Sequence, residues 1–320
     1  MSCPTEPCNS SCACTGGPSQ DRPPVDLSAF RELYPFESHF LETGGARLHY
    51  LDEGSGEPVL MLHGNPTWSF FYRNMALGLR SRCRVIAPDH VGCGLSDKPQ
   101  DYDYTLARHI ANLEKLVDSL GLERITLLVH DWGGPIGMGF ATRHPERIRR
   151  LIVMNTAAYT RPPGAPFPDL IRSCRLPLFG DVTVRGMNLF VRAALRWCAM
   201  KTERMTPAVR AGYLAPYSNF ADRVAVLRFV QDIPFGPADP SHAVVRQIEA
   251  GLPSLAGRPI LFIWGMRDFC FTPHYLDHWL KFFPGAEVER LAEAGHYLLE
   301  DAHELILPRV ARFLDEHPLV

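Results

Sequence analysis

The chain has 320 residues, of which 46% are hydrophobic, and a formal net charge of −2 at pH 7. This length accommodates two domains, or one α/β domain that carries an insertion. The lack of a basic excess argues against a nucleic-acid partner and favours a small apolar substrate. Residues 1–24 lack the apolar run of a signal peptide, and no uninterrupted apolar run is long enough for a transmembrane segment. We therefore expect a cytoplasmic protein.

The first 30 residues are rich in Pro, Ser, Thr and Gly and contain four cysteines, at positions 3, 8, 12 and 14. This composition predicts a disordered tail. The cysteine spacing matches no standard zinc pattern and no histidine accompanies it, so we expect neither a metal nor a cofactor. The five remaining cysteines are scattered through apolar or helical sequence, as reduced thiols would be.

From about Arg47 the pattern becomes regular. Residues 46–54 alternate like a strand, and 58–64 and 83–89 are apolar runs typical of buried strands. A helical period over 104–121 closes at Gly121, which occupies the C-cap position. A strand over 124–130, a helix over 134–146 and a strand over 148–155 follow. Strands that alternate with helices predict a mostly parallel sheet with helices on both faces.

The alternation stops at about residue 156. Residues 157–256 are first proline-rich and then helical in period, which predicts an inserted helical cap. The core would therefore comprise residues 31–156 and 257–320. Its second part would supply two more strands, 259–265 and 286–291, and two more helices, 274–283 and 300–316. No internal repeat is visible.

One expected cap helix, over 184–201, carries cations beside Leu, Phe and Trp; these are Arg185, Arg192, Arg196 and Lys201. Such a helix suits a membrane surface or a partner protein. Packing of its apolar face over the active site explains the same pattern, and we favour that interpretation.

Three polar residues stand where predicted strands end. Asp131 follows strand 124–130, Asp268 follows strand 259–265, and His296 follows the last strand. Open α/β sheets place their chemistry at the carboxyl ends of strands. The chain order of nucleophile, acid and histidine is that of an α/β-hydrolase triad, so we predict that Asp131, Asp268 and His296 are catalytic.

Several motifs together resemble those of the haloalkane dehalogenase family of α/β-hydrolases. They are "HGNPTW" (63–68), "PDHVGCGLSDKP" (88–99), "VHDWGG" (129–134), "RDFCF" (267–271) and "GHYLLED" (295–301), with a similar cap phrase over 213–240. The resemblance extends from about Tyr34 to Leu314. It implies an α/β-hydrolase fold and a reaction that cleaves a carbon–halogen bond through an alkyl ester of the enzyme.

The chemistry of a carboxylate nucleophile agrees with this resemblance. A serine that attacked a saturated carbon would form an ether, which water does not readily cleave. An aspartate forms an ester, which water activated by His296 can hydrolyse. Asp268 would orient His296 and stabilise its imidazolium form.

A departing anion needs donors that strengthen as its charge develops. The resemblance implies that the indole N–H of Trp132 and the side-chain amide of Asn65 bind the halide. Core packing of Trp132 and a turn role for Asn65 before Pro66 are the alternatives. Backbone N–H groups of Asn65 and Trp132 would form an oxyanion hole during ester hydrolysis.

The position of the predicted catalytic acid, Asp268, indicates which dehalogenase subfamily the chain resembles. Some dehalogenases carry a glutamate after the strand read here as 148–155, but this chain has Asn155, which cannot serve as an anionic partner of histidine. The pattern resembles the third dehalogenase subfamily. That subfamily also includes the β-lactone decarboxylases of long-chain olefin biosynthesis, so a carboxylate is the alternative leaving group.

Two further functions stay open. An epoxide hydrolase also attacks with an aspartate and would use cap tyrosines, for which Tyr159, Tyr213 and Tyr217 are candidates. A non-catalytic binding protein on the same fold is the other, although all three expected catalytic residues are present. We therefore expect a haloalkane dehalogenase-like enzyme, with a cis-β-lactone decarboxylase as the alternative. The sequence determines neither the substrate itself nor whether the chain forms a homo-oligomer.

Overall fold

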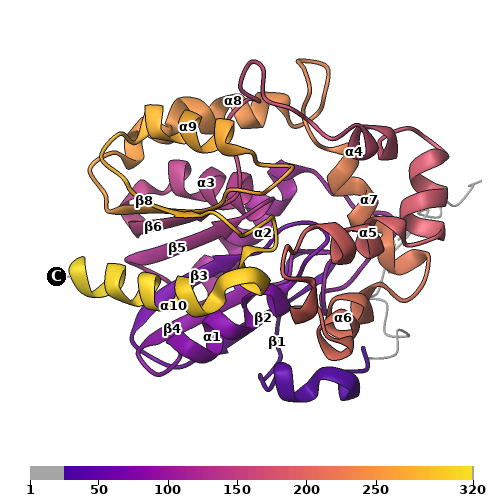
Figure 1. Ribbon diagram of the computed structural model, residues 1–320, viewed down its shortest axis with the longest axis horizontal. Helices are drawn as coiled ribbons and strands as arrows, with labels where there is room; N and C mark the ends of the chain where they lie inside the picture. Colours follow the sequence, from indigo (N-terminus) through magenta and orange to yellow (C-terminus); the bar gives the residue numbers. More distant parts are fainter. Residues whose placement is uncertain (1–24, 319–320) are drawn as a thin grey trace, which may run out of the picture.

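The computed structural model describes residues 25–318, and one eight-stranded sheet organises them (Figure 1). The strands are β1 (His39–Glu42), β2 (Arg47–Glu53), β3 (Glu57–Leu62), β4 (Cys83–Pro88), β5 (Ile125–His130), β6 (Ile148–Met154), β7 (Ile260–Gly265) and β8 (Glu287–Leu291). Their order is β1-β2-β4-β3-β5-β6-β7-β8. β1 and β2 pair antiparallel with each other and β2 pairs antiparallel with β4, whereas β3 to β8 are parallel. The predicted α/β-hydrolase fold with a mostly parallel sheet is confirmed.

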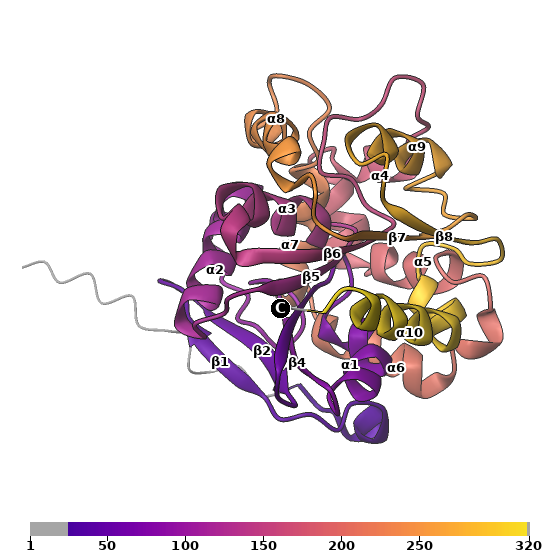
Figure 2. The ribbon, with the colours of Figure 1, turned by 90° about the vertical axis from the view of Figure 1, so that its left-hand side faces the viewer.

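Helices cover both faces of the sheet (Figure 2). On one face lie α1 (Arg73–Leu79) and α10 (Leu298–Glu316), and on the other α2 (Leu106–Ser119), α3 (Gly133–Arg143), α8 (His242–Gly251) and α9 (Pro273–Phe282). Successive side chains of a strand point to opposite faces. In β3, Val59 and Met61 pack on the α10 side, Leu60 and Leu62 pack on the α3 side, and all four are fully buried. Burial on both faces explains why these strands read as continuous apolar runs.

Four of the helices between β6 and β7 fall in the range of the predicted cap, and we call these four the cap helices: α4 (Asp169–Cys174), α5 (Leu189–Trp197), α6 (Pro207–Leu214) and α7 (Val224–Gln231). They lie beside the sheet, on the right in Figure 1. The single helix expected over 184–201 is broken. A π-helical turn ends at Gly186, and Asn188 takes the left-handed conformation with φ 55° before α5 begins. Asn tolerates this conformation, and the Asn188 amide donates to the Tyr217 carbonyl oxygen at 3.3 Å. No helix between residues 25 and 318 is long and apolar enough to cross a membrane.

Two expected boundaries differ from the structure. The tail cysteines at positions 3, 8, 12 and 14 lie outside the described residues. The expected disordered tail reached residue 30, and this boundary is wrong for residues 28–30, which are ordered. Ser28–Leu33 forms a 3-10 helix, and Phe30 is buried edge-on against Phe70, with ring centroids 5.4 Å apart. Helix α8, which falls within the predicted cap range, packs on α3 through Ile248.

A buried ion pair joins the cap to the core. The Arg73 guanidinium donates to both carboxylate oxygens of Glu300, at 2.5 and 2.7 Å, and lies over the ring of Phe70. The hydroxyl of Tyr213, in cap helix α6, donates to the same carboxylate at 2.5 Å. The pair therefore ties α1, α6 and α10 together, and both charged side chains are almost completely buried.

We expect Glu300→Ala to lower the free energy of unfolding by about 3–5 kcal/mol, because it leaves the charge of Arg73 buried without a partner. Urea denaturation measures the change. Glu304→Ala is the matched control on the same helix: it removes an exposed ion pair with Arg204 and should cost no more than about 1 kcal/mol. Equal costs for the two variants would show that the buried pair does not hold the cap on the core.

Candidate active site

The turn that carries Asp131 is tightly constrained. Asp131 follows β5 directly, has φ 49°, and precedes α3. A Cβ at residue 133 would lie 2.0 Å from the Leu62 carbonyl oxygen, and one at residue 134 would lie 1.8 Å from Thr156 Oγ1. Only glycine therefore fits at these two positions. The Thr156 hydroxyl donates to the Asp131 carbonyl oxygen at 2.5 Å and braces the turn.

The structure brings the three expected catalytic side chains together. His296 Nδ1 lies 2.8 Å from Asp268 Oδ2, and His296 Nε2 lies 3.7 Å from Asp131 Oδ2. Asp268 Oδ1 accepts the backbone N–H groups of Cys270 and Phe271 at 2.7 and 3.1 Å. Burial by itself would lower the pKa of His296, but the charge and hydrogen bond of Asp268 together with Asp131 raise that pKa overall.

The carboxylate of Asp131 is directed by backbone donors. Its Oδ1 accepts the N–H of Asn65 at 2.7 Å, and the N–H of Trp132 also stabilises the charged form. Burial raises the pKa of Asp131 above the usual value of a carboxyl, whereas His296 and the two N–H groups oppose the rise. The two donors occupy the place expected of an oxyanion hole, and Oδ2 remains on the side of His296.

The side chains of Asn65 and Trp132 line the cavity in front of Asp131. The Asn65 amide donates one hydrogen to the Val226 carbonyl oxygen of α7, at 3.1 Å, which leaves its second N–H for a ligand. Within residues 25–318 the indole N–H of Trp132 has no hydrogen-bond acceptor. Two neutral donors and the carboxylate of Asp131 therefore line one cavity.

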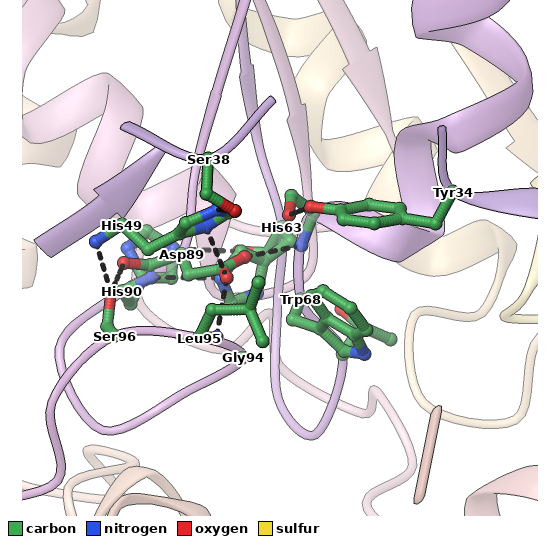
Figure 3. A network of polar contacts seen from close by, with 12 residues as sticks. Tyr34, Ser38, His49, His63, Trp68, Asp89, His90, Gly94, Leu95 and Ser96 are labelled. Atoms are coloured by element: carbon green, nitrogen blue, oxygen red, sulfur yellow. Dashed lines mark hydrogen bonds and ion pairs between the residues drawn. The ribbon is translucent and has the colours of Figure 1, made fainter. Parts of the chain in front are cut away.

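The buried carboxylate of Asp89 holds the chain on both sides of the Asn65 loop, and Figure 3 shows its contacts. Asp89 accepts the His49 ring N–H at 2.9 Å and the Ser69 and Leu95 backbone N–H groups at 2.7 and 2.8 Å. His90, the next residue, donates its backbone N–H to His63 Nε2 at 3.0 Å, and its ring lies 2.9 Å from the His63 carbonyl oxygen. These contacts fix the chain immediately before Gly64 and Asn65.

The loop of His296 is also held from several sides, by residues that sequence reasoning did not single out. Asp301 accepts the Gly295 N–H at 2.8 Å through one oxygen, and through the other it accepts two cap N–H groups, those of Met200 and Lys201, at 2.8 Å. The ring of His130 lies 2.9 Å from the His296 carbonyl oxygen. Asp301 stands within the "GHYLLED" motif, which was the only signal in the sequence for this role.

The side chain of Asn155 makes hydrogen bonds within the sheet. Its amide donates to the Gly265 carbonyl oxygen at 3.1 Å, and its Oδ1 accepts the Gly265 N–H at 2.7 Å. The side chain therefore joins the ends of β6 and β7. This position agrees with the prediction that Asp268, not the residue after β6, pairs with the histidine.

Two apolar cavities meet at Asp131. The larger measures about 520 Å³ and runs under α4 and α5, past Leu189 and Trp197. The smaller measures about 140 Å³ and runs toward α8 and α9, past Val245 and Tyr275. Five residues line both: Asp131, Trp132, Ile171, Ile233 and Cys270. Across residues 25–318, no His, Cys, Asp or Glu side chains are grouped in threes as metal ligands would be.

The three candidate tyrosines of an epoxide hydrolase are engaged elsewhere. Tyr159 donates to the Tyr275 carbonyl oxygen at 2.6 Å, Tyr213 donates to Glu300, and Tyr217 donates to the Thr67 carbonyl oxygen at 3.3 Å. Each hydroxyl proton is therefore already donated within the protein. None of these three hydroxyls is therefore available to protonate an epoxide oxygen.

Comparison with known proteins agrees with this geometry. Residues 57–302 match the family model described as alpha/beta hydrolase fold. A cis-3-alkyl-4-alkyloxetan-2-one decarboxylase of Shewanella oneidensis is 48% identical over 89% of this chain and 90% of its own length. Haloalkane dehalogenase 2 of Mycobacterium bovis is 35% identical over 88% of this chain and 96% of its own.

Among solved structures, the haloalkane dehalogenase DatA of Agrobacterium tumefaciens superposes with a TM-score of 0.81. It is 25% identical, and the match covers 88% of this chain and 97% of that one. The resemblance predicted from the motifs, including the subfamily that contains β-lactone decarboxylases, is confirmed. The chain is therefore an enzyme of the α/β-hydrolase fold family.

Proposed function

We propose that the enzyme converts a cis-β-lactone with two alkyl arms into an alkene and CO₂. The observation that carries this proposal is the pair of apolar cavities, about 520 and 140 Å³, that diverge from Asp131. A β-lactone substituted at C3 and C4 presents two apolar chains from one reacting ring. The decarboxylase of Shewanella oneidensis, named for such a substrate, supports the same assignment.

The reaction uses the residues in the following roles. Asp131 attacks ring carbon C4, the C4–O bond breaks, and its electron pair leaves with the C2 carboxylate. The C2–C3 bond then breaks, its electrons form the C3=C4 double bond, and the carboxylate of Asp131 departs from C4 while CO₂ is released. Atoms and charge balance without water. Inversion at C4 followed by anti elimination converts a cis lactone into a cis alkene.

The surrounding groups stabilise these steps. The second N–H of the Asn65 amide and the indole N–H of Trp132 bind the carboxylate that leaves C4. The backbone N–H groups of Asn65 and Trp132 hold Asp131 Oδ1 in the ester. His296, paired with Asp268, provides positive charge beside both carboxylates. The predicted cap, residues 157–256, supplies most of the apolar lining.

Dehalogenation of a haloalkane is the second candidate, and one observation favours it. Two neutral N–H donors in one cavity suit a halide, and attack by Asp131 at a saturated carbon is common to both reactions. The difference arises after the ester forms, because an alkyl ester without an adjacent carboxylate must be hydrolysed by water activated by His296.

To test this proposal, the enzyme is incubated with a synthetic cis-3,4-dialkyl β-lactone, and the rates at which cis alkene and CO₂ form are measured. Wild type should form both in equal amounts, and Asp131→Ala should lose at least about a hundred-fold in rate because no other group can form the ester. Asp315→Ala, a change at an exposed aspartate on α10, is the control and should leave the rate unchanged. Formation of a β-hydroxy acid in place of the alkene would overturn the decarboxylase assignment.

Replacement of His296 should separate the two reactions. His296→Gln should stop haloalkane turnover and leave an alkyl ester on Asp131, visible by intact-protein mass spectrometry, whereas lactone decarboxylation should fall less than about ten-fold because it needs no water. In wild type, haloalkane turnover should increase as pH rises through the pKa of His296, which Asp268 and Asp131 raise above the usual value of a histidine, because only the neutral ring accepts a proton. Lactone decarboxylation should lack this increase.

The control for this experiment is His303→Gln, which alters a half-exposed histidine of α10. Equal losses of about a hundred-fold on both substrates for His296→Gln would show that the lactone reaction also requires proton transfer by His296, and would contradict the water-free route.

Replacement of Asn65 tests the leaving-group donors. Asn65→Ala should lower halide release by about a hundred-fold, and at least about ten-fold more than Asn65→Gln, which keeps an amide. Lactone opening should change less, because ring strain drives it and its leaving carboxylate can make several contacts. Circular dichroism checks that each variant is folded. Small, equal losses of halide release in both variants would identify Asn65 as a turn residue only.

A further inference from the structure

The cap segment 161–200 differs in charge from the rest of the molecule. It contains six arginines and two aspartates, so its formal charge is +4 in a chain whose net charge is −2. Arg175 and Arg185 pair with Asp239 and Asp181. Among the described residues, no carboxylate pairs with Arg172, Arg192 or Arg196. Positive charge that the protein does not neutralise is therefore concentrated on this part of the cap.

The same segment exposes large apolar side chains around an opening of the larger cavity. Four residues both line that cavity and are at least 42% exposed, namely Leu170, Phe179, Leu189 and Trp197. Four more lie beside them without lining it, namely Leu176, Leu178, Val182 and Met187. We call residues 170–197 the cap-tip face. It lies on the side of the molecule opposite the C-terminal end of α10 (Figure 1).

Burial over the active site explains only part of this pattern. In α5, Val191, Ala194 and Leu195 are buried, whereas Leu189 and Trp197 remain about half exposed. Leu178 is 75% exposed and has φ 63°, a conformation unfavourable for leucine. Exposed apolar side chains among arginines are typical of a surface that lies in a membrane interface, where Trp and Arg sit at the level of the headgroups.

We propose that the cap-tip face docks on an anionic lipid bilayer, with the opening of the larger cavity toward the lipid. Unpaired arginines complement the negative surface of such a bilayer. A second copy of the chain is a poorer occupant, because a two-fold interface would bring the positive face against itself. The inference goes beyond the proposed function, although a substrate with two alkyl arms would concentrate in the same bilayer.

The test measures co-sedimentation of the full chain with lipid vesicles in the absence of any substrate. One vesicle population contains phosphatidylcholine alone, and the other also contains phosphatidylglycerol. We expect binding to the anionic vesicles that weakens as salt is added. Because no substrate is present, failure of this experiment would leave the decarboxylase proposal untouched, and failure of that proposal would leave this one untouched.

Variants outside the cavity locate the surface. Leu176→Asp should weaken vesicle binding by about ten-fold or more, because Leu176 would no longer enter the interface. Arg172→Gln should weaken it by roughly five-fold through the loss of one charge. Leu305→Asp is the matched control, since Leu305 on α10 and Leu176 are both 58% exposed. It should bind like wild type.

Three results would overturn the proposal. The first is equal binding of wild type to both vesicle populations, or no binding. The second is equal weakening by Leu176→Asp and Leu305→Asp. The third is self-association of wild type in analytical ultracentrifugation that Leu176→Asp abolishes while vesicle binding stays unchanged. That result would assign the cap-tip face to a second copy of the chain.

Discussion

The constraint on which the site depends is a carboxylate that must remain ionised at the junction of two apolar cavities. Burial favours the neutral form of Asp131 and raises its pKa. The N–H groups of Asn65 and Trp132 and the neighbouring ring of His296 offset that cost. Each of these groups lies on a different loop, so the loops themselves must be fixed. Asp89 behind the Asn65 loop, Thr156 behind the Asp131 turn and Asp301 behind the His296 loop supply that support.

The cap takes part in the same arrangement. Its helix α7 orients the Asn65 amide through the Val226 carbonyl, its residues Met200 and Lys201 bind Asp301, and Tyr213 binds Glu300. The cap thus both forms the apolar lining and positions polar groups of the core. A change in the cap that alters the shape of the cavities will also move the donors around Asp131. Selection of substrate and stabilisation of charge are therefore physically coupled in this fold.

Local patterns in the sequence predicted the sheet, the order of Asp131, Asp268 and His296, and their meeting at the ends of strands, because strand period and chain order determine these features directly. Other features depend on packing between distant segments. Phe30 packs in an aromatic cluster with Phe70 and Trp68. Asn188, which interrupts a helical pattern, donates its amide hydrogen bond to the Tyr217 carbonyl oxygen. The two cavities likewise share Ile171 and Ile233 in their walls, and these residues stand far apart in the sequence. None of these long-range contacts has a local signature.

A lactone and a haloalkane make the same demand on the first half of the reaction, since both require attack at a saturated carbon and stabilisation of an anion that leaves it. They differ in whether the resulting ester has a carboxylate on the neighbouring carbon. An ester with a neighbouring carboxylate loses CO₂ by shifting electrons within itself. Transfer of that carboxylate out of water favours the loss, because CO₂ is uncharged and the charge that returns to Asp131 is held by the N–H groups of Asn65 and Trp132. Most of the side chains that line the cavities around Asp131 are apolar. An apolar setting of this kind slows hydrolysis by limiting water and promotes decarboxylation, so one nucleophile on one fold can serve two reactions that differ only in the second step.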